Sequence, residues 1–469
     1  MSAREVSLIA LGEFRRGRDT GTALRLAFAG AGTDDSCTDR SVTYLRDKNL
    51  AMRMFNGVLQ NMALCDFYAE CFSSIALKKL EPRVLDIIRL SIYQIVFLTK
   101  VPRSAAVSEG VSLAKKYANT RAAGYVNAVL RKISDAAERS ELPQPDGDFE
   151  HKLSIKYSHP LWLVHELNES LGPDGAEAYL KAGNEPDTPV TAQVNRLSTD
   201  TDKTLAALKT DGIAALRHAF LEDCIEMYGP GEISNLEAFT GGYMYIQDAA
   251  ARLVVTAADP KPGDFVIDGC AAPGGKSFAA AIVMNDTGRI VALDVNERKL
   301  RLINDGAKRL GISIIETFNK DAAVPLHDMA TSTPIPGVCE DWSSKADVVL
   351  ADVPCSGFGV IRKKPDIRYK REKDISGLPE IQFDILTGLS SYVKPGGLLV
   401  YSTCTVLKRE NDAVVERFLA ECCDFSPEDF SLPGIRTSRD GKLRLLPHIH
   451  GTDGFFICKL RKCKDDHDE

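Results

Sequence analysis

The chain has 469 residues, 44% of them hydrophobic and 26% charged, which is typical of a soluble globular protein of two to four domains. No run of 18 uncharged apolar residues occurs, which excludes a membrane span, and the N-terminus reads as an amphipathic helix rather than a signal peptide. The net charge of −7 hides an asymmetry, since residues 1–140 hold 21 Lys and Arg against 14 Asp and Glu. A basic region on an acidic body indicates that this region meets a polyanion.

The twelve cysteines form neither a CxxC pair nor a cluster with histidines at zinc spacing. We therefore expect free thiols in a reducing cytoplasm and no metal site.

Helical periodicity dominates the first 140 residues, where no strand-like alternation occurs. The stretch 84–98 is almost uniformly apolar and predicts a central, buried helix. The segment "ELPQPDGDFE" (141–150) combines two prolines and a glycine with acids and indicates a linker. We predict an all-α domain over 1–140, with helices at 4–14, 50–72, 84–98, 104–118 and 121–139.

Residues 151–240 have a mixed pattern that predicts a small α+β domain. A helix is expected at 158–172, with Pro160 near its first turn and Gly172 near its end. Strands are expected at 191–195 and 224–229, on either side of a helix at 201–210.

From residue 247 onward the pattern alternates between apolar, β-branched strands and helices. This alternation predicts a parallel, doubly wound sheet of the α/β class, in which ligands bind at the carboxyl ends of the strands. Five side chains fall just past those ends: Asp268, Asp294, Asp321, Asp352 and Cys404. The predicted strands are 264–269, 289–294, 312–318, 346–352, 397–403 and 454–460.

The segment "DGCAAPGGKS" (268–277) follows the first of these strands. Its glycines and small residues let a backbone approach a ligand closely, although a simple packing turn explains them equally well. It matches neither GxGxxG nor a P-loop, so nucleotide phosphates are not the expected ligand. Asp294, at the next strand end, suits ribose hydroxyls, with a helix N-cap as the alternative. Asp321 would then lie near an adenine ring, or is a solvated loop residue.

Two cysteines follow strand ends, Cys355 in "ADVPCSGFGV" and Cys404 in "VYSTCTVL". Either is a small buried side chain or a nucleophile held at the sheet edge, and spacing alone does not decide between the two thiols. The run "VIRKKPDIRYKREK" (360–373) holds seven basic and two acidic residues, which indicates a solvated face or a nucleic-acid contact.

Three segments resemble the motifs of RNA 5-methylcytosine methyltransferases that use S-adenosylmethionine: 268–277, 351–369 and "LVYSTCTVLKREND" (399–412). Segments within 82–133 resemble the NusB-like RNA-binding helical domain, and this combination resembles the RsmB (Sun/Fmu) family, which methylates a cytosine in 16S rRNA. The resemblance implies a multidomain chain, with a NusB-like domain (1–140), a small α+β RNA-binding domain (151–240) and a Rossmann-like methyltransferase domain (241–464).

By the same resemblance, Cys404 is the nucleophile, Cys355 assists product release, and Asp352 lies at cytosine N3 and the cofactor. Cys270, here through its backbone, is expected in the cofactor site. The other expected cofactor residues are Ala271, Ala272, Pro273, Gly274, Gly275, Lys276, Asp294, Asp321 and Asp352. Residues placed at the RNA are Arg362, Lys363, Lys364, Arg368 and Tyr369, with the lysines and arginines on phosphates and the tyrosine on a base.

The chain departs from the family in small ways. "KREND" (408–412) replaces a more acidic string, which leaves the roles of Glu410 and Asn411 open, and 327–345 looks like an elaborated loop. Two alternatives remain: the same reaction on another RNA such as tRNA, and a non-catalytic RNA-binding factor built on the NusB-like domain. We expect a monomer.

Overall fold

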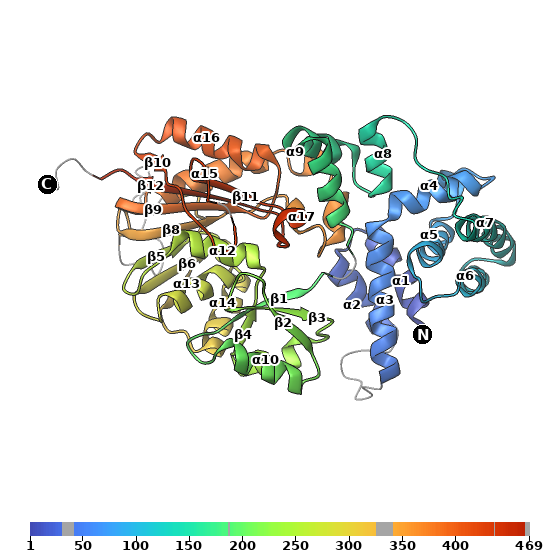
Figure 1. The fold of residues 1–469 in the computed structure, drawn as a ribbon, viewed down its shortest axis with the longest axis horizontal. Helices are drawn as coiled ribbons and strands as arrows, with labels where there is room; N and C mark the ends of the chain where they lie inside the picture. Colours follow the sequence, from blue (N-terminus) through green and yellow to red (C-terminus); the bar gives the residue numbers. More distant parts are fainter. Residues whose placement is uncertain (31–41, 186–187, 325–340, 436, 465–469) are drawn as a thin grey trace. The chain divides into compact units, whose positions relative to one another are not determined.

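The computed structural model describes residues 1–30, 42–185, 188–324, 341–435 and 437–464 (Figure 1). The expected loop at 327–345 thus lies largely outside the described residues. The chain divides into two compact units, Met1–Pro186 with Ile361–Lys370, and Asp187–Val360 with Arg371–Glu469. The middle of the basic run therefore belongs to the N-terminal unit, although it follows Cys355 in the chain.

The N-terminal unit is all-helical, as predicted for residues 1–140, but it extends to Pro186 and so includes the helix that we expected at 158–172 in the small α+β domain. Its central helix is α5 (Pro82–Phe97), which starts with a proline in its first turn and buries Ile87, Ile88, Leu90 and Ile92. The other helices are α1 (Ala3–Arg15), α2 (Thr20–Gly30), α3 (Val42–Gln60), α4 (Met62–Phe72), α6 (Arg103–Tyr117), α7 (Thr120–Glu138), α8 (Phe149–Lys156) and α9 (Leu161–Ala182), with a 3₁₀ turn at Leu77–Lys79.

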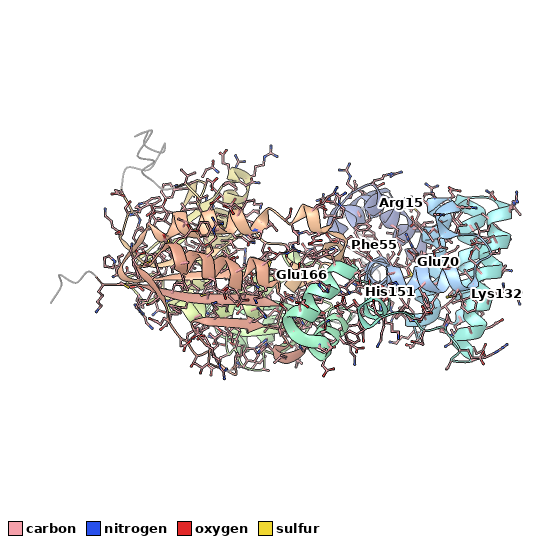
Figure 2. All side chains as sticks on the ribbon, turned by 90° about the horizontal axis from the view of Figure 1, so that it is seen from above. Arg15, Phe55, Glu70, Lys132, His151 and Glu166 are labelled. Atoms are coloured by element: carbon pink, nitrogen blue, oxygen red, sulfur yellow. The ribbon has the colours of Figure 1, made fainter. Side chains whose placement is uncertain are left out.

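Close packing in this unit depends on a glycine. A Cβ on Gly57 of α3 would lie about 2 Å from the ring of Tyr93 on α5, so a larger residue would force the two helices apart. Phe55, also on α3, is fully buried, whereas Lys132 on α7 is exposed (Figure 2).

Two helix predictions differ from the structure. The segment 50–72 is divided at Asn61 into α3 and α4. The helix expected to stop near Gly172 kinks there, with a φ of 72°, and then continues to Ala182. Glycine adopts this left-handed conformation without steric cost, so the chain turns and resumes its helix.

The second unit begins with a four-stranded antiparallel sheet of order β2-β3-β1-β4. The predicted strands appear as β1 (Val190–Val194) and β3 (Cys224–Tyr228), with α10 (Thr201–Thr210) between them. The sequence missed β2 (Ala214–Arg217), which is largely exposed, and the three-residue β4 (Met244–Ile246). Short segments of this kind carry little periodic signal.

The main sheet has the order β10-β12-β9-β8-β5-β6-β7, and β11 pairs with β12. Its strands are β5 (Phe265–Asp268), β6 (Arg289–Asp294), β7 (Ile315–Asn319), β8 (Ala346–Asp352), β9 (Val393–Thr403), β10 (Phe425–Pro427), β11 (Lys442–Leu445) and β12 (Phe455–Lys462). The prediction of a parallel sheet holds for β5 to β9, whereas the three C-terminal strands are antiparallel.

Alternate residues of the parallel strands face opposite cores, as a period of two requires. Val266 and Ile290 pack in the core that holds α12 (Ala249–Ala258), α13 (Gly275–Val283) and α14 (Glu297–Leu310). Their neighbours Ile267 and Val291 pack in the opposite core, which holds α15 (Leu378–Ser390) and α16 (Asp412–Glu421). The sheet is thus doubly wound, and loops gather at its carboxyl edge. None of the described helices combines the length and apolarity of a membrane span.

Candidate active site

Two thiols meet at the carboxyl edge of the sheet. Cys355 follows β8 and Cys404 follows β9, and their sulfur atoms are 3.2 Å apart. The pKa of Cys355 is raised well above its usual value, first by its hydrogen bond with Cys404, then by burial and by the negative charges of Cys404, Glu410 and Asp352. A raised pKa means that the Cys355 thiol holds its proton more firmly than a free cysteine does.

The two turns that carry these thiols are joined directly. The hydroxyls of Ser356 and Thr405 are 2.8 Å apart and both residues are fully buried. The amide of Gly359 donates to the carbonyl of Cys404 at 2.9 Å. A Cβ on Gly359 would lie 1.8 Å from the carbonyl oxygen of Gly454, so only glycine allows this approach.

Asp352, the last residue of β8, lies beside the thiols and is held from two sides. The Lys276 ammonium is 2.5 Å from its Oδ2 atom, and the Ser402 hydroxyl donates to its Oδ1 atom at 2.7 Å. The Lys276 side chain is 9% exposed and also lies over the ring of Phe455. The lysine expected in the cofactor turn is thus the ion-pair partner of the predicted cytosine contact.

The glycine turn after β5 has the conformation that its composition suggests. Gly274 has a φ of 109° and is the N-cap residue of α13, and the amide of Ala271 donates to the carbonyl of Leu293 on β6 at 2.9 Å. Burial raises the pKa of the Cys270 thiol, which disfavours its reactive thiolate form. Burial also raises the pKa of Asp268 to about 6, although the Ser277 hydroxyl donates to it.

Asp294 lies at the tip of β6, where its Oδ2 atom accepts the amide of Ala272 at 3.3 Å. The N-cap of α14 is Asn296, whose side chain accepts from Arg298, so the capping alternative for Asp294 does not hold. Asp321, past β7, is exposed and accepts the amide of Ala323. The glycine turn, Asp294, Asp352 and both thiols therefore line one edge of the sheet.

The expected RNA contact of Arg368 is wrong. This side chain is 0% exposed and lies inside the N-terminal unit, where its guanidinium donates to the carbonyl of Gln60 at 2.7 Å and to Asn184 Oδ1 at 2.9 Å. The hydroxyl of Tyr369 donates to the carbonyl of Leu59, and its ring lies edge-on to Phe14. A basic run predicts a surface because charges are usually solvated, but a guanidinium can instead satisfy buried carbonyl groups.

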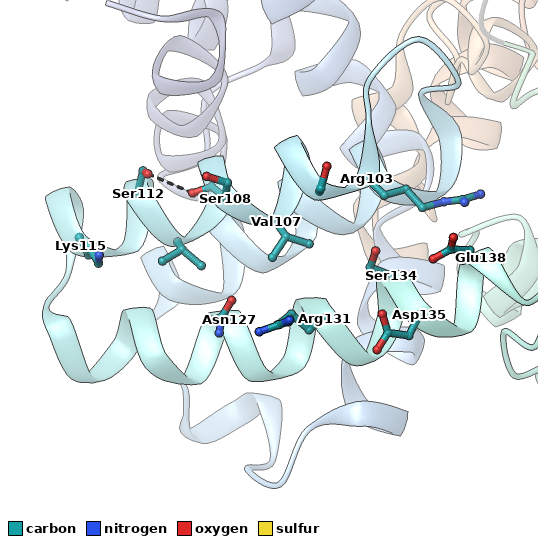
Figure 3. Close-up of a pocket in the computed structure, with 12 residues that line it drawn as sticks. Arg103, Val107, Ser108, Ser112, Lys115, Asn127, Arg131, Ser134, Asp135 and Glu138 are labelled. Carbon is teal, nitrogen blue, oxygen red and sulfur yellow. Dashed lines mark hydrogen bonds between the residues drawn. The ribbon is translucent and has the colours of Figure 1, made fainter.

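Lys363 and Lys364 of the same run are exposed, and Arg362 is partly exposed. Within the N-terminal unit, a polar groove of about 770 Å³ also lies between α6 and α7. In Figure 3, Ser108 and Ser112 of α6 lie across from Asn127 and Arg131 of α7. Arg103 and Lys115 add positive charge, and Asp135 and Glu138 add negative charge at one end.

The sequence reasoning did not name Gln382 and left the roles of Glu410 and Asn411 open. Gln382, Glu410 and Asn411 are fully buried, and each bonds to one of the two cysteine turns. The signal for Glu410 and Asn411 was their place in the segment "KREND" (408–412), shortly after Cys404. No group of three or more His, Cys, Asp or Glu suited to a metal occurs in the part of the chain that the structure describes.

Three family models match consecutive parts of the chain. The NusB family model matches residues 1–135, a ferredoxin-like domain model of RsmF/B-like methyltransferases matches 159–234, and the model of the 16S rRNA methyltransferase RsmB/F matches 255–461.

Curated relatives and solved structures agree with these models. The probable ribosomal RNA small subunit methyltransferase B of Bacillus subtilis is 37% identical over 425 residues, covering 89% of this chain and 91% of the relative. That of Vibrio cholerae is 31% identical, covering 89% and 90%. The crystal structure of PH0851 matches with a TM-score of 0.77 and 25% identity over 98% of both chains. A methyltransferase homolog protein from Pyrococcus horikoshii matches with a TM-score of 0.55 and 27% identity, over 68% of this chain and all of that one.

Proposed function

Because the chain belongs to the RsmB/F family of S-adenosylmethionine-dependent methyltransferases, we propose that it methylates C5 of a cytosine in 16S rRNA through a covalent bond between Cys404 and cytosine C6. The observation that carries this proposal is the pair of thiols 3.2 Å apart at the carboxyl edge of the sheet. A cysteine that only fills space in the core needs no second thiol beside it. The proposed reaction uses both, Cys404 for addition to C6 and Cys355 for release of the product.

The residues around the glycine turn fit S-adenosylmethionine. Gly274 and the small side chains of Ala271 and Ala272 leave the backbone open, and Asp294 at the tip of β6 offers a carboxylate to ribose hydroxyls. Asp321 is proposed to lie beside the adenine. When bound, this cofactor supplies a methyl group on a positively charged sulfur. The raised pKa of the Cys270 thiol disfavours its thiolate as a competing nucleophile.

Cys404 activates the base. C5 of cytosine is a poor nucleophile, but addition of the Cys404 thiolate to C6 makes the ring enamine-like. C5 would then be nucleophilic enough to take the methyl group from the bound cofactor, whose carbon–sulfur bond would break to leave a neutral thioether. Removal of the C5 proton by a base then breaks the bond between C6 and the sulfur and restores both the ring and the thiolate. The raised pKa of Cys355 supports this assignment, because Cys355 keeps its proton while Cys404 attacks.

Asp352 and Lys276 are proposed to stabilise the negative charge that develops on the cytosine ring during addition at C6. Addition at C6 places electron density on N3, which a proton or hydrogen bond stabilises. The two side chains share a charge-assisted hydrogen bond of 2.5 Å, so a proton is available beside the thiols. Ser402 fixes the other oxygen of Asp352 and thereby its direction.

The RNA is proposed to meet the exposed cations of the chain. Lys363, Lys364 and Arg362 follow the Cys355 turn, and Arg103, Lys115 and Arg131 line the groove of the helical unit. Lys and Arg side chains contact phosphates without reading sequence. The target cytosine must leave its stack to reach Cys404.

The substrate is tested by incubating the purified protein with S-adenosylmethionine and either protein-free 16S rRNA, small-subunit particles or bulk tRNA, followed by bisulfite sequencing. We expect one protected cytosine in 16S rRNA and none in tRNA. A protected cytosine only in tRNA would show that tRNA is the substrate, while the proposed reaction would stand. No protected cytosine in any RNA would contradict the proposal.

A further inference from the structure

Glu410 is a fully buried carboxylate next to the thiol pair. It has no ion-pair partner among the residues that the structure describes, and its Oε1 atom is buried without a hydrogen bond there. An ionised carboxylate away from water costs several kcal/mol unless its surroundings compensate. Such a residue at an active site suggests a function that a neutral side chain does not provide.

The contacts of Glu410 converge on the turn that carries Cys355. Its Oε2 atom accepts the amide of Ser356 at 2.8 Å and the Nε2 atom of Gln382 at 2.9 Å. Gln382 also donates to the carbonyl of Pro354 at 3.0 Å. The residues on both sides of Cys355 are therefore held by the carboxylate and its amide partner.

The next residue holds the other turn. Asn411 accepts the Thr403 hydroxyl at 2.6 Å and donates to the carbonyl of Thr405 at 3.1 Å, so it holds both neighbours of Cys404. The Tyr401 hydroxyl donates to the carbonyl of Glu410 at 2.6 Å and links this pair to β9. Two consecutive residues thus hold the two thiol turns, one turn each.

The side chains that hold the two cysteine turns, Glu410 and Asn411, differ in charge. The side of Cys355 faces a carboxylate, and the side of Cys404 faces a neutral amide. The charged or titratable groups that act most strongly on Cys355 are Cys404, Glu410 and Asp352, and Tyr401 faces Cys355 and Glu410. Lys276 is engaged by Asp352. A negative charge beside one of two touching thiols favours the proton on that thiol.

We propose that Glu410 is a positioning residue of the thiol pair: its carboxylate fixes the Cys355 turn and keeps the shared proton on Cys355, so that Cys404 presents the thiolate. The role of Glu410 in catalysis rests on the proposed function, because the Cys404 thiolate is the group that would add to cytosine. It is nevertheless a property of the free protein, without RNA or cofactor.

Iodoacetamide alkylation tests the assignment, because only thiolates react at an appreciable rate. Peptide mass spectrometry follows both cysteines over time in the purified full chain. In the unsubstituted protein we expect Cys404 to react at least about tenfold faster than Cys355. In Glu410→Gln, which keeps the size of the side chain, we expect this ratio to fall at least about threefold.

A second measurement isolates the charge. In a Cys404→Ser background, Cys355 is the only thiol of the pair, and its alkylation rate is measured against pH. Glu410→Gln should move the midpoint to lower pH, since removing a negative charge favours the thiolate. Glu416→Gln is the matched control, because this glutamate is exposed on α16, and it should leave the midpoint unchanged.

Several outcomes would overturn the assignment. One is an unsubstituted protein in which Cys355 reacts as fast as Cys404, a result that needs no variant to fold. Another is an identical pH midpoint with and without Glu410. A merely structural role would lower the unfolding temperature of Glu410→Gln without moving the midpoint. Absence of methyl transfer with the alkylation order intact would refute the proposed function alone.

Discussion

The ammonium of Lys276 lies 2.5 Å from the carboxylate of Asp352, which links the glycine turn after β5 to the end of β8. The Lys276 side chain thus connects the proposed cofactor site with the proposed binding site of the target cytosine. Of the two groups, Lys276 is the more deeply buried, with 9% of its side chain exposed against 28% for Asp352.

Replacing Lys276 should therefore impair catalysis more than folding. For Lys276→Met we expect methyl transfer to fall about 100-fold, because Asp352 loses its proton-bearing partner. Initial rates with labelled S-adenosylmethionine measure this loss. Lys261→Met removes an exposed lysine paired with Asp259 before β5, and it should keep full activity. An unchanged rate for Lys276→Met would contradict the proposed role.

Substitution of the two cysteines should block the reaction at different steps. Cys404→Ala should show no methyl transfer and no protein–RNA adduct, because the bond to C6 cannot form. Cys355→Ala should accumulate an adduct visible on a denaturing gel, because release is impaired. Cys423→Ala, at an exposed position, serves as the control. Full turnover by Cys404→Ala would rule out this cysteine as the nucleophile.

Arg368 should contribute to stability rather than to RNA binding. Its burial lowers the pKa of the guanidinium to about 10, and its removal leaves the carbonyl of Gln60 and the side chain of Asn184 without their donor. We expect Arg368→Met to lower the free energy of unfolding by about 2–4 kcal/mol in urea denaturation. Arg371→Gln, at an exposed position, should change the free energy of unfolding by close to zero. Equal changes in the two variants would contradict a stabilising role for the buried Arg368.

The stability contribution of Asp268 should depend on pH. Burial raises its pKa from 3.8 to about 6 in the folded chain, so the folded state binds more protons than the unfolded state between these values. Folding is then penalised as pH rises through this window, and the penalty is constant above it. Asp268→Asn should gain stability relative to the unsubstituted protein between about pH 4 and pH 6. Urea titrations at a series of pH values measure the difference, and a flat difference would contradict it.

The groove between α6 and α7 should contribute a phosphate contact. Arg131→Glu is expected to weaken binding of 16S rRNA about tenfold and to reduce the slope of log affinity against log salt by about one. Fluorescence anisotropy at several salt concentrations measures both. Lys132→Glu changes the next residue of α7, which does not line the groove, and the same loss in both variants would indicate a general charge effect.

Much of the local structure followed from the sequence. Periodicity near 3.6 identified most helices of the first unit, including the buried α5, but not α2, α8 or the first part of α3, and apolar strands identified β5 to β9 with bounds close to those observed. The strand-end position of Cys355, Cys404, Asp294 and Asp352 also followed, because parallel strands present their carboxyl ends at one edge. The short strands β2, β4, β10 and β11 did not, since three or four residues carry little periodic signal; β5, which also has four residues, was identified from its apolar, β-branched composition.

The contacts that decide the site came only from the tertiary structure. Sequence alone determined that two thiols lie at one sheet edge, but not that their sulfurs are 3.2 Å apart or that Glu410 and Asn411 hold one turn each. It indicated a basic surface at 360–373, whereas Arg368 is buried within the helical unit. Periodicity reports which face of an element is apolar. The pairing of turns far apart in the chain, and the burial of a charge among carbonyl groups, depend on long-range packing, which no local pattern encodes.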